Sequence, residues 1–148
     1  MTSRTRKDPR HRAREAALQI LYQWEIGRGE VEAAAAMFFT HQWPDGEAPA
    51  DELRTFAVSL AVDTVARLET IDPLIADTAD RWRPERMAVL DRLILRMAVC
   101  ELLRDRGTPA PVVINEALEL ARTFSTEESV KFINGMLDAI RKKIESHS

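Results

Sequence analysis

The amino terminus carries a dense group of basic side chains whose chemistry suits a polyanion. The first fourteen residues hold six of them and one acid: Arg4, Arg6, Lys7, Arg10, Arg12 and Arg14, with Asp8. Because this segment carries +5 and the whole chain −3, the remaining 134 residues carry −8. A basic arm on an acidic body favours nucleic-acid binding, since Arg donates paired hydrogen bonds to phosphate and stacks on bases. The alternative is a solvated tail that serves only solubility.

Two aromatic residues lie away from the apolar stripes of their expected helices. On a helical wheel, Tyr22 points nearly opposite to the stripe that contains Ile20 and Trp24. The residues expected on its side are His11, Glu15, Leu18 and Gln19. Phe132 lies about 100° from the stripe of the last helix, near Lys131 and Asn134. An exposed ring can stack on an unpaired base; the alternatives are packing of Tyr22 on a neighbouring helix and a place at the core edge for Phe132.

Catalytic chemistry finds little support in the sequence. The three histidines, His11, His41 and His147, are far apart, and Cys100 is the only cysteine. Metal-ligand spacing, a glycine-rich phosphate loop and a nucleophile elbow are all missing from the sequence. We therefore expect a binding protein, with no catalytic residue, metal or cofactor.

The bulk properties favour one cytoplasmic domain. A chain of 148 residues can bury a sizeable core without disulfides. No apolar region follows the basic start, and no run of eighteen apolar residues occurs, so neither a signal peptide nor a membrane-spanning helix is expected. The expected organisation is a flexible basic arm over residues 1–9 and a single all-helical domain over residues 10–148.

Helical periodicity predicts an all-α fold of about seven helices that position these side chains. The expected ranges are about 10–26, 30–42, 51–68, 73–82, 85–104 and 111–124, followed by a last helix that begins near residue 125. Asp72 and Pro73 have the pattern of an N-cap and first helical residue. Ser125 and Glu128 have the pattern of a capping box for the last helix.

The segment over residues 85–104 is predicted to be the central helix. Thirteen of the seventeen residues from Met87 to Leu103 are apolar, which is typical of a helix buried on nearly all sides. The charged residues Asp91, Arg92, Arg96 and Glu101 argue against a membrane span. The best boundary between two packed halves is expected around residues 70–84.

Four sequence blocks resemble the NusB family of bacterial transcription antitermination factors. They are RAREAALQILYQWE (12–25), VLDRLILRMAVCELL (89–103), PVVINEALELARTFSTEES (111–129) and KFINGMLDAI (131–140). The combination is far more specific than any one block and runs along nearly the whole chain. The resemblance implies an all-helical fold of two packed helical bundles.

The resemblance also implies a function and its partners. It implies RNA binding to the boxA element together with NusE, a small-subunit ribosomal protein, within an antitermination complex of RNA polymerase and other Nus factors. Such a complex supports processive transcription of ribosomal RNA operons. The alternative is a helical protein-interaction module with no RNA specificity of its own. The family includes homodimers, and the sequence leaves monomer and homodimer open.

The resemblance assigns site residues by matching positions. Arg4 to Arg14 match the RNA-binding arm, and Tyr22 matches a block used for RNA contact, as do Lys131, Phe132 and Asn134. Glu85 and Asp91 match acidic positions on the side of the protein partner, NusE. The chain departs from the family pattern where Ser125 replaces a glycine and where Asp8 and Pro9 interrupt the basic run.

Overall fold

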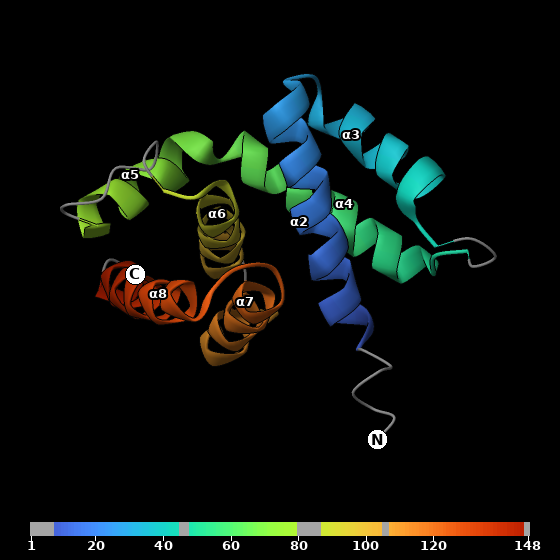
Figure 1. The fold of residues 1–148 in the computed structure, drawn as a ribbon. Coiled ribbons are helices and arrows are strands. Elements are labelled where there is room, and N and C mark those ends of the chain that lie inside the picture. The colour runs from blue at the N-terminus through green and yellow to red at the C-terminus, as the bar shows by residue number, and fades with distance from the viewer. Residues whose placement is uncertain (1–7, 45–47, 80–86, 105–106, 147–148) are drawn as a thin grey trace. The chain divides into compact units, whose positions relative to one another are not determined.

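The computed structural model describes residues 8–44, 48–79, 87–104 and 107–146 (Figure 1). Within these ranges the chain forms seven α-helices and a short π-helical segment, η1, without any strand. The all-α prediction is confirmed. The chain divides into two compact units, residues 1–65 and 66–148. The boundary falls slightly before the region expected from the sequence.

The first unit contains α2 (Pro9–Gly27), α3 (Val31–Met37), η1 (Phe38–Gln42) and α4 (Asp51–Ala66). Helix α2 begins where Asp8 accepts a hydrogen bond from the Arg10 backbone N–H at 3.2 Å, with Pro9 in the first turn. Asp8 and Pro9, which interrupt the basic run, therefore start the helix. It ends at Arg28, whose left-handed backbone (φ 59°) directs its N–H to the Trp24 carbonyl.

The expected helix over residues 30–42 forms, but its last turn is wider than an α-helix. The Trp43 N–H donates to the carbonyl of Phe38, five residues earlier, at 3.1 Å. This turn brings three aromatic rings together. The ring centroids of Phe38 and Phe39 are 5.1 Å apart, and those of Phe39 and Trp43 are 5.5 Å apart. The two phenylalanine rings are buried, and η1 packs beside α2 within the first unit.

The second unit contains α5 (Leu68–Ala79), α6 (Val89–Arg104), α7 (Ala110–Phe124) and α8 (Glu127–Ser146). Helices α6, α7 and α8 pack on one another, and α5 packs on α6 and α8 (Figure 1). Ten of the sixteen residues of α6 are buried. The prediction of a buried central helix is therefore confirmed within this unit, because apolar side chains around the whole helix need partners on every side.

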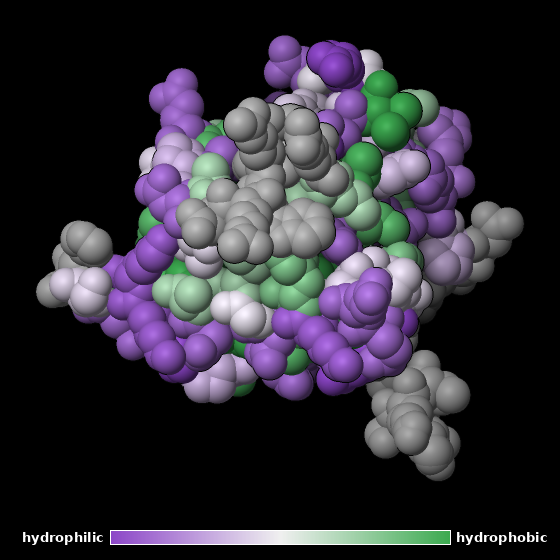
Figure 2. All heavy atoms as spheres, turned by 60° about the vertical axis from the view of Figure 1, so that its left-hand side comes forward, coloured by the Kyte–Doolittle hydropathy of each residue, from purple (hydrophilic) through white to green (hydrophobic). Residues whose placement is uncertain are grey.

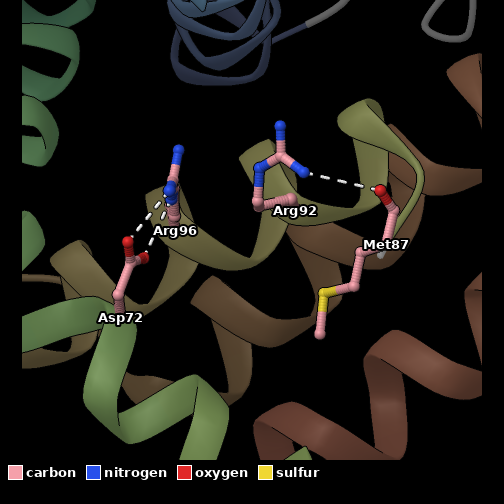
Figure 3. A network of polar contacts seen from close by, with 4 residues as sticks. All are labelled: Asp72, Met87, Arg92 and Arg96. Carbon is pink, nitrogen blue, oxygen red and sulfur yellow. Dashed lines mark hydrogen bonds and ion pairs between the residues drawn. The ribbon is translucent and has the colours of Figure 1, made fainter. Parts of the chain in front are cut away.

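The predicted cap of the fourth helix is wrong. Helix α5 begins at Leu68, five residues before Pro73, and Pro73 lies inside it. Asp72 is used elsewhere: its two carboxylate oxygens accept from Arg96 Nε and Nη2, each at 2.9 Å (Figure 3). On the same face of α6, Arg92 Nη1 donates to the Met87 carbonyl at 3.5 Å. Asp72, which the sequence pattern predicted to cap the helix, therefore forms an ion pair with Arg96 of α6 instead.

The predicted capping box of the last helix is also shifted by one residue. The Ser129 backbone N–H donates to Thr126 Oγ1 at 3.0 Å, which makes Thr126 the capping residue of α8. Ser125 closes α7 instead, since its N–H donates to the Ala121 carbonyl at 2.7 Å. The Ser125 hydroxyl is occupied by a residue of α6, described below.

The surface in Figure 2 is mostly hydrophilic, with smaller hydrophobic areas between the charged side chains. Among the described residues, no helix has the length and apolar character needed to cross a membrane.

Candidate nucleic-acid interface

The described part of the basic arm lies on the first turns of α2. Arg4, Arg6 and Lys7 lie outside the described residues. Arg10 is exposed, and its Cζ lies 4.2 Å from the ring centroid of Phe56 in α4. Arg12 is half-buried, and its Cζ lies 4.8 Å from the Trp43 ring. A guanidinium that stacks through its face can still donate hydrogen bonds from its N–H edge.

Arg14 does not belong to the exposed arm. Only 3% of its surface is exposed, and its Cζ lies 5.2 Å from the Phe56 ring. We therefore propose a packing role for Arg14, and its assignment to phosphate binding stays a prediction. The physical reason is the spacing: Arg10 and Arg14 are one helical turn apart, so both meet the same ring.

Tyr22 is exposed on α2, with 43% of its surface accessible. The wheel placed Tyr22 away from the apolar stripe and left exposure and packing on a neighbouring helix open; it also placed Leu18 on the same side, and Leu18 is buried. Ile26, one turn after Tyr22, is 62% exposed. The exposed strip of α2 is therefore narrower than predicted, and an aromatic and an aliphatic side chain stand on it.

The second unit has a groove at the start of α8, with a volume of about 480 Å³. Its lining includes Met87, Thr126, Glu128, Lys131 and Phe132. Phe132 is half-buried and Lys131 is exposed, so a ring face and an ammonium group border one hollow. Such a pair can stack on a base and hold a phosphate.

The remaining residues matched to the KFIN block and the protein partner have different positions. Asn134 is exposed on α8 but is not part of the groove lining. Glu85 lies outside the described residues. Asp91, at the start of α6, is 9% exposed, and its carboxylate faces the groove and the turn between α7 and α8. The matched residues thus fall into two groups, Arg10, Arg12 and Tyr22 in the first unit and Lys131, Phe132 and Asp91 in the second.

Sequence reasoning missed the hydroxyl groups around Asp91. Ser125 Oγ and Ser129 Oγ each donate to a different carboxylate oxygen of Asp91, both at 2.8 Å. The signal was available, because an acid on a helix that is apolar all round must find hydrogen-bond partners when it is buried. The segment STEES, residues 125–129, contains three hydroxyl side chains that can donate such hydrogen bonds.

The described residues offer little for metal chemistry. Among them, no three His, Cys, Asp or Glu side chains are grouped so that they could hold a metal ion. The groove lining presents charged and aromatic side chains.

Comparison with known proteins identifies the class to which this fold and these surfaces belong. The sequence profile of the NusB family matches residues 11–142, and the chain belongs to this family. The transcription antitermination protein NusB of Solibacter usitatus (strain Ellin6076) is 47% identical over 135 residues, which cover 91% of this chain and 90% of that protein. A second relative, the transcription antitermination protein NusB of Koribacter versatilis (strain Ellin345), is 43% identical over 137 residues, which cover 93% of this chain and 91% of that protein.

Solved structures have the same fold. T. maritima NusB has a TM-score of 0.81 at 34% identity, with 92% of each chain covered. A crystal structure of the antitermination factors NusB and NusE in complex with dsRNA has a TM-score of 0.78 at 24% identity, with 91% of this chain and 97% of that chain covered. The second likeness shows the fold; its RNA and NusE belong to that structure.

Proposed function

We propose that this chain binds boxA-type single-stranded RNA jointly with NusE, and that it acts in the cytoplasm as part of an antitermination complex with RNA polymerase and other Nus factors. In that complex it supports processive transcription of ribosomal RNA operons. The observation that carries the proposal is the groove in which Phe132 and Lys131 border one hollow. Its volume of about 480 Å³ is in the range of small-ligand sites.

The groove favours a single-stranded nucleic acid over a polyanion without bases. Single-stranded RNA exposes its bases, and readers of single strands stack them on aromatic rings while cations hold the backbone. Phe132 offers the ring and Lys131 the cation. A polyanion without bases would use only Lys131.

The first unit adds a second set of contacts of the same chemistry. Arg10 and Arg12 offer guanidinium groups on the first turns of α2, and Tyr22 offers an exposed ring on the same helix. On a single strand, log K falls by about 0.7 for each phosphate contact when the salt concentration rises tenfold. The arm therefore supplies affinity and salt dependence, and the aromatic rings supply selectivity.

The family relatives support the partner. One crystal structure with the same fold contains the antitermination factors NusB and NusE in complex with dsRNA. In our proposal NusE docks on this chain and extends the RNA platform. The two ligands then strengthen each other's binding reciprocally.

The experiment that tests the proposal is a titration of labelled boxA RNA and a scrambled RNA, each with and without NusE, at two salt concentrations. We expect tighter binding to boxA than to the scrambled RNA, a further gain with NusE, and weaker binding at the higher salt concentration. Equal binding of both RNAs in every condition would reduce the arm to a nonspecific basic tail.

A second candidate function is a helical protein-interaction module without RNA specificity, which includes a homodimer. The observation that favours it is the exposure of large apolar side chains in the first unit, where Ile26 is 62% and Met37 55% exposed. Apolar side chains of this size are common at protein interfaces. Light scattering of the free chain distinguishes a homodimer from a monomer, and the RNA titration above distinguishes the two functions.

A further inference from the structure

The carboxylate of Asp91 joins three helices of the second unit. Asp91 lies in the first turn of α6, Ser125 closes α7, and Ser129 lies in the first turn of α8. Ser125 Oγ donates to Oδ1 and Ser129 Oγ to Oδ2, both at 2.8 Å. We call these three residues the Asp91 latch.

The latch is continuous with the cap of α8. Ser129 Oγ accepts from Thr126 Oγ1 at 3.1 Å, and the Ser129 N–H donates to the same Thr126 oxygen at 3.0 Å. Ser125 Oγ also lies 2.9 Å from Ser129 Oγ, so its one hydrogen has two acceptors within reach, of which the charged Asp91 carboxylate is the stronger. The first turn of α8 is therefore held from its backbone and from the carboxylate at once.

The latch lies beside the groove residues that we assign to RNA. Asp91, Thr126 and Ser129 line the same groove as Lys131 and Phe132. Lys131 and Phe132 follow Ser129 by two and three residues on α8. A change in the pitch or rotation of the first turn would therefore move both side chains.

We propose that Asp91 is a positioning residue that fixes Lys131 and Phe132 for RNA through Ser125 and Ser129. This inference rests on the proposed function and gives Asp91 a role within the chain in place of a direct contact with NusE. A carboxylate that is 9% exposed and accepts from two hydroxyls has little left to offer a protein partner. The cost of burying its charge is offset by those two hydrogen bonds.

Charge repulsion alone predicts the opposite change in RNA affinity when Asp91 is removed, so the two explanations can be distinguished by experiment. An acid that lines a groove for a polyanion repels it, so removal of Asp91 should strengthen RNA binding if charge alone acts. Positioning predicts that Asp91→Ala weakens binding. Asp91→Asn separates the two effects, because the amide keeps one acceptor and gains a donor that the serine oxygens can accept.

The test is a boxA RNA titration of the full chain, without NusE and with it, for the wild type, Asp91→Ala and Asp91→Asn, with circular dichroism to confirm the fold. A loss that appears only with NusE would indicate a partner contact and would overturn the positioning role. Glu127→Gln is the matched control, since Glu127 is an exposed acid in the first turn of α8 that is not part of the groove lining. We expect about tenfold weaker binding for Asp91→Ala, and binding within about twofold of the wild type for Asp91→Asn and for Glu127→Gln. The magnitude of the slope of log K against log salt should fall by at most about 0.7 in Asp91→Ala, because Lys131 is the one phosphate contact that the change would displace.

The outcomes separate this inference from the proposed function. If the wild type does not discriminate boxA from scrambled RNA, the proposed function fails and the inference fails with it. If the wild type discriminates but Asp91→Ala binds as tightly as the wild type or tighter, only the inference is overturned. Should Asp91→Ala not fold, the single changes Ser125→Ala and Ser129→Ala decide: each removes one hydrogen bond of the latch, and wild-type affinity in both would overturn it.

Discussion

Arg96 of α6 holds both carboxylate oxygens of Asp72 of α5, with Nε–Oδ1 and Nη2–Oδ2 distances of 2.9 Å (Figure 3). Paired charge-assisted hydrogen bonds of this kind fix orientation as well as distance. The Arg96 side chain is 12% exposed, so solvent screens the pair only in part. The pair ties α5 to the central helix of the second unit.

Asp72→Ala should therefore lower the free energy of unfolding by about 2 kcal/mol, because it leaves a mostly buried guanidinium with fewer acceptors. Urea denaturation followed by circular dichroism measures this. Glu119→Ala is the control, since Glu119 pairs with Arg122 at 2.8 Å where both side chains are about half exposed. The control should change the free energy of unfolding by less than about 1 kcal/mol. An equal loss in both variants would show that the Asp72–Arg96 pair stabilises the fold no more than an exposed ion pair does.

Arg10→Ala and Arg14→Ala should have different effects although the residues are one turn apart. Arg10 is exposed, so its loss should reduce the magnitude of the negative slope of log K against log salt by about 0.7, while the fold is retained. Arg14 is buried against Phe56, so its loss should reduce stability by about 1–3 kcal/mol and leave the salt slope unchanged. RNA titrations at three salt concentrations, with urea denaturation of each variant, measure both. A reduced salt slope in Arg14→Ala would contradict its packing role.

Tyr22→Ala should weaken RNA binding by about 1–3 kcal/mol if the ring stacks on a base. Stability should change little, since the side chain is 43% exposed. Tyr22→Phe keeps the ring and should bind within about twofold of the wild type. Fluorescence titration of the three proteins tests this. Ile26→Ala is the matched control on the same exposed strip, and an equal loss there would point to a general apolar contact in place of stacking.

The acid limb of the stability curve should depend on Asp138. Hydrogen bonds from Arg141, at 3.2 Å, and then from Lys142 lower the pKa of Asp138 below its ordinary 3.8. Because the pKa is lower in the folded chain, this stabilisation is complete above about pH 4 and is lost as the pH falls through the folded value. Arg141→Gln should raise the pKa of Asp138 toward 3.8, which NMR titration of the side-chain carboxyl carbon measures. An unchanged pKa in Arg141→Gln would show that Arg141 is not the main cause.

The sequence predicted the elements well where a long periodic pattern determined them. The buried stripe of α2 and the apolar run of α6 are both local in sequence, and both helices form at nearly the expected bounds. The exposure of Tyr22 also follows from its own helix, because the inward direction is set by neighbours within a few turns.

The sequence failed where a distant partner competes for a polar side chain. Asp72 has the pattern of a helix cap, but Arg96, twenty-four residues later, takes its carboxylate. Ser125 and Thr126 are adjacent hydroxyl residues, and Asp91, thirty-four residues before Ser125, decides which of them caps α8. Arg14 has the composition of the basic arm, but the Phe56 ring of another helix buries it. These contacts join residues far apart in the sequence, so a pattern of neighbouring residues cannot predict them.

The most direct measurement of the central claim is the ratio of the Kd for scrambled RNA to the Kd for boxA RNA, with NusE saturating and the salt concentration fixed. Salt-dependent contacts by Arg10, Arg12 and Lys131 act on any RNA, so they cancel in this ratio. We predict a ratio above about ten, since each discriminating base contact contributes about 1–3 kcal/mol, and a fall toward one in the double variant Tyr22→Ala, Phe132→Ala. A ratio of one for the wild type would contradict the account.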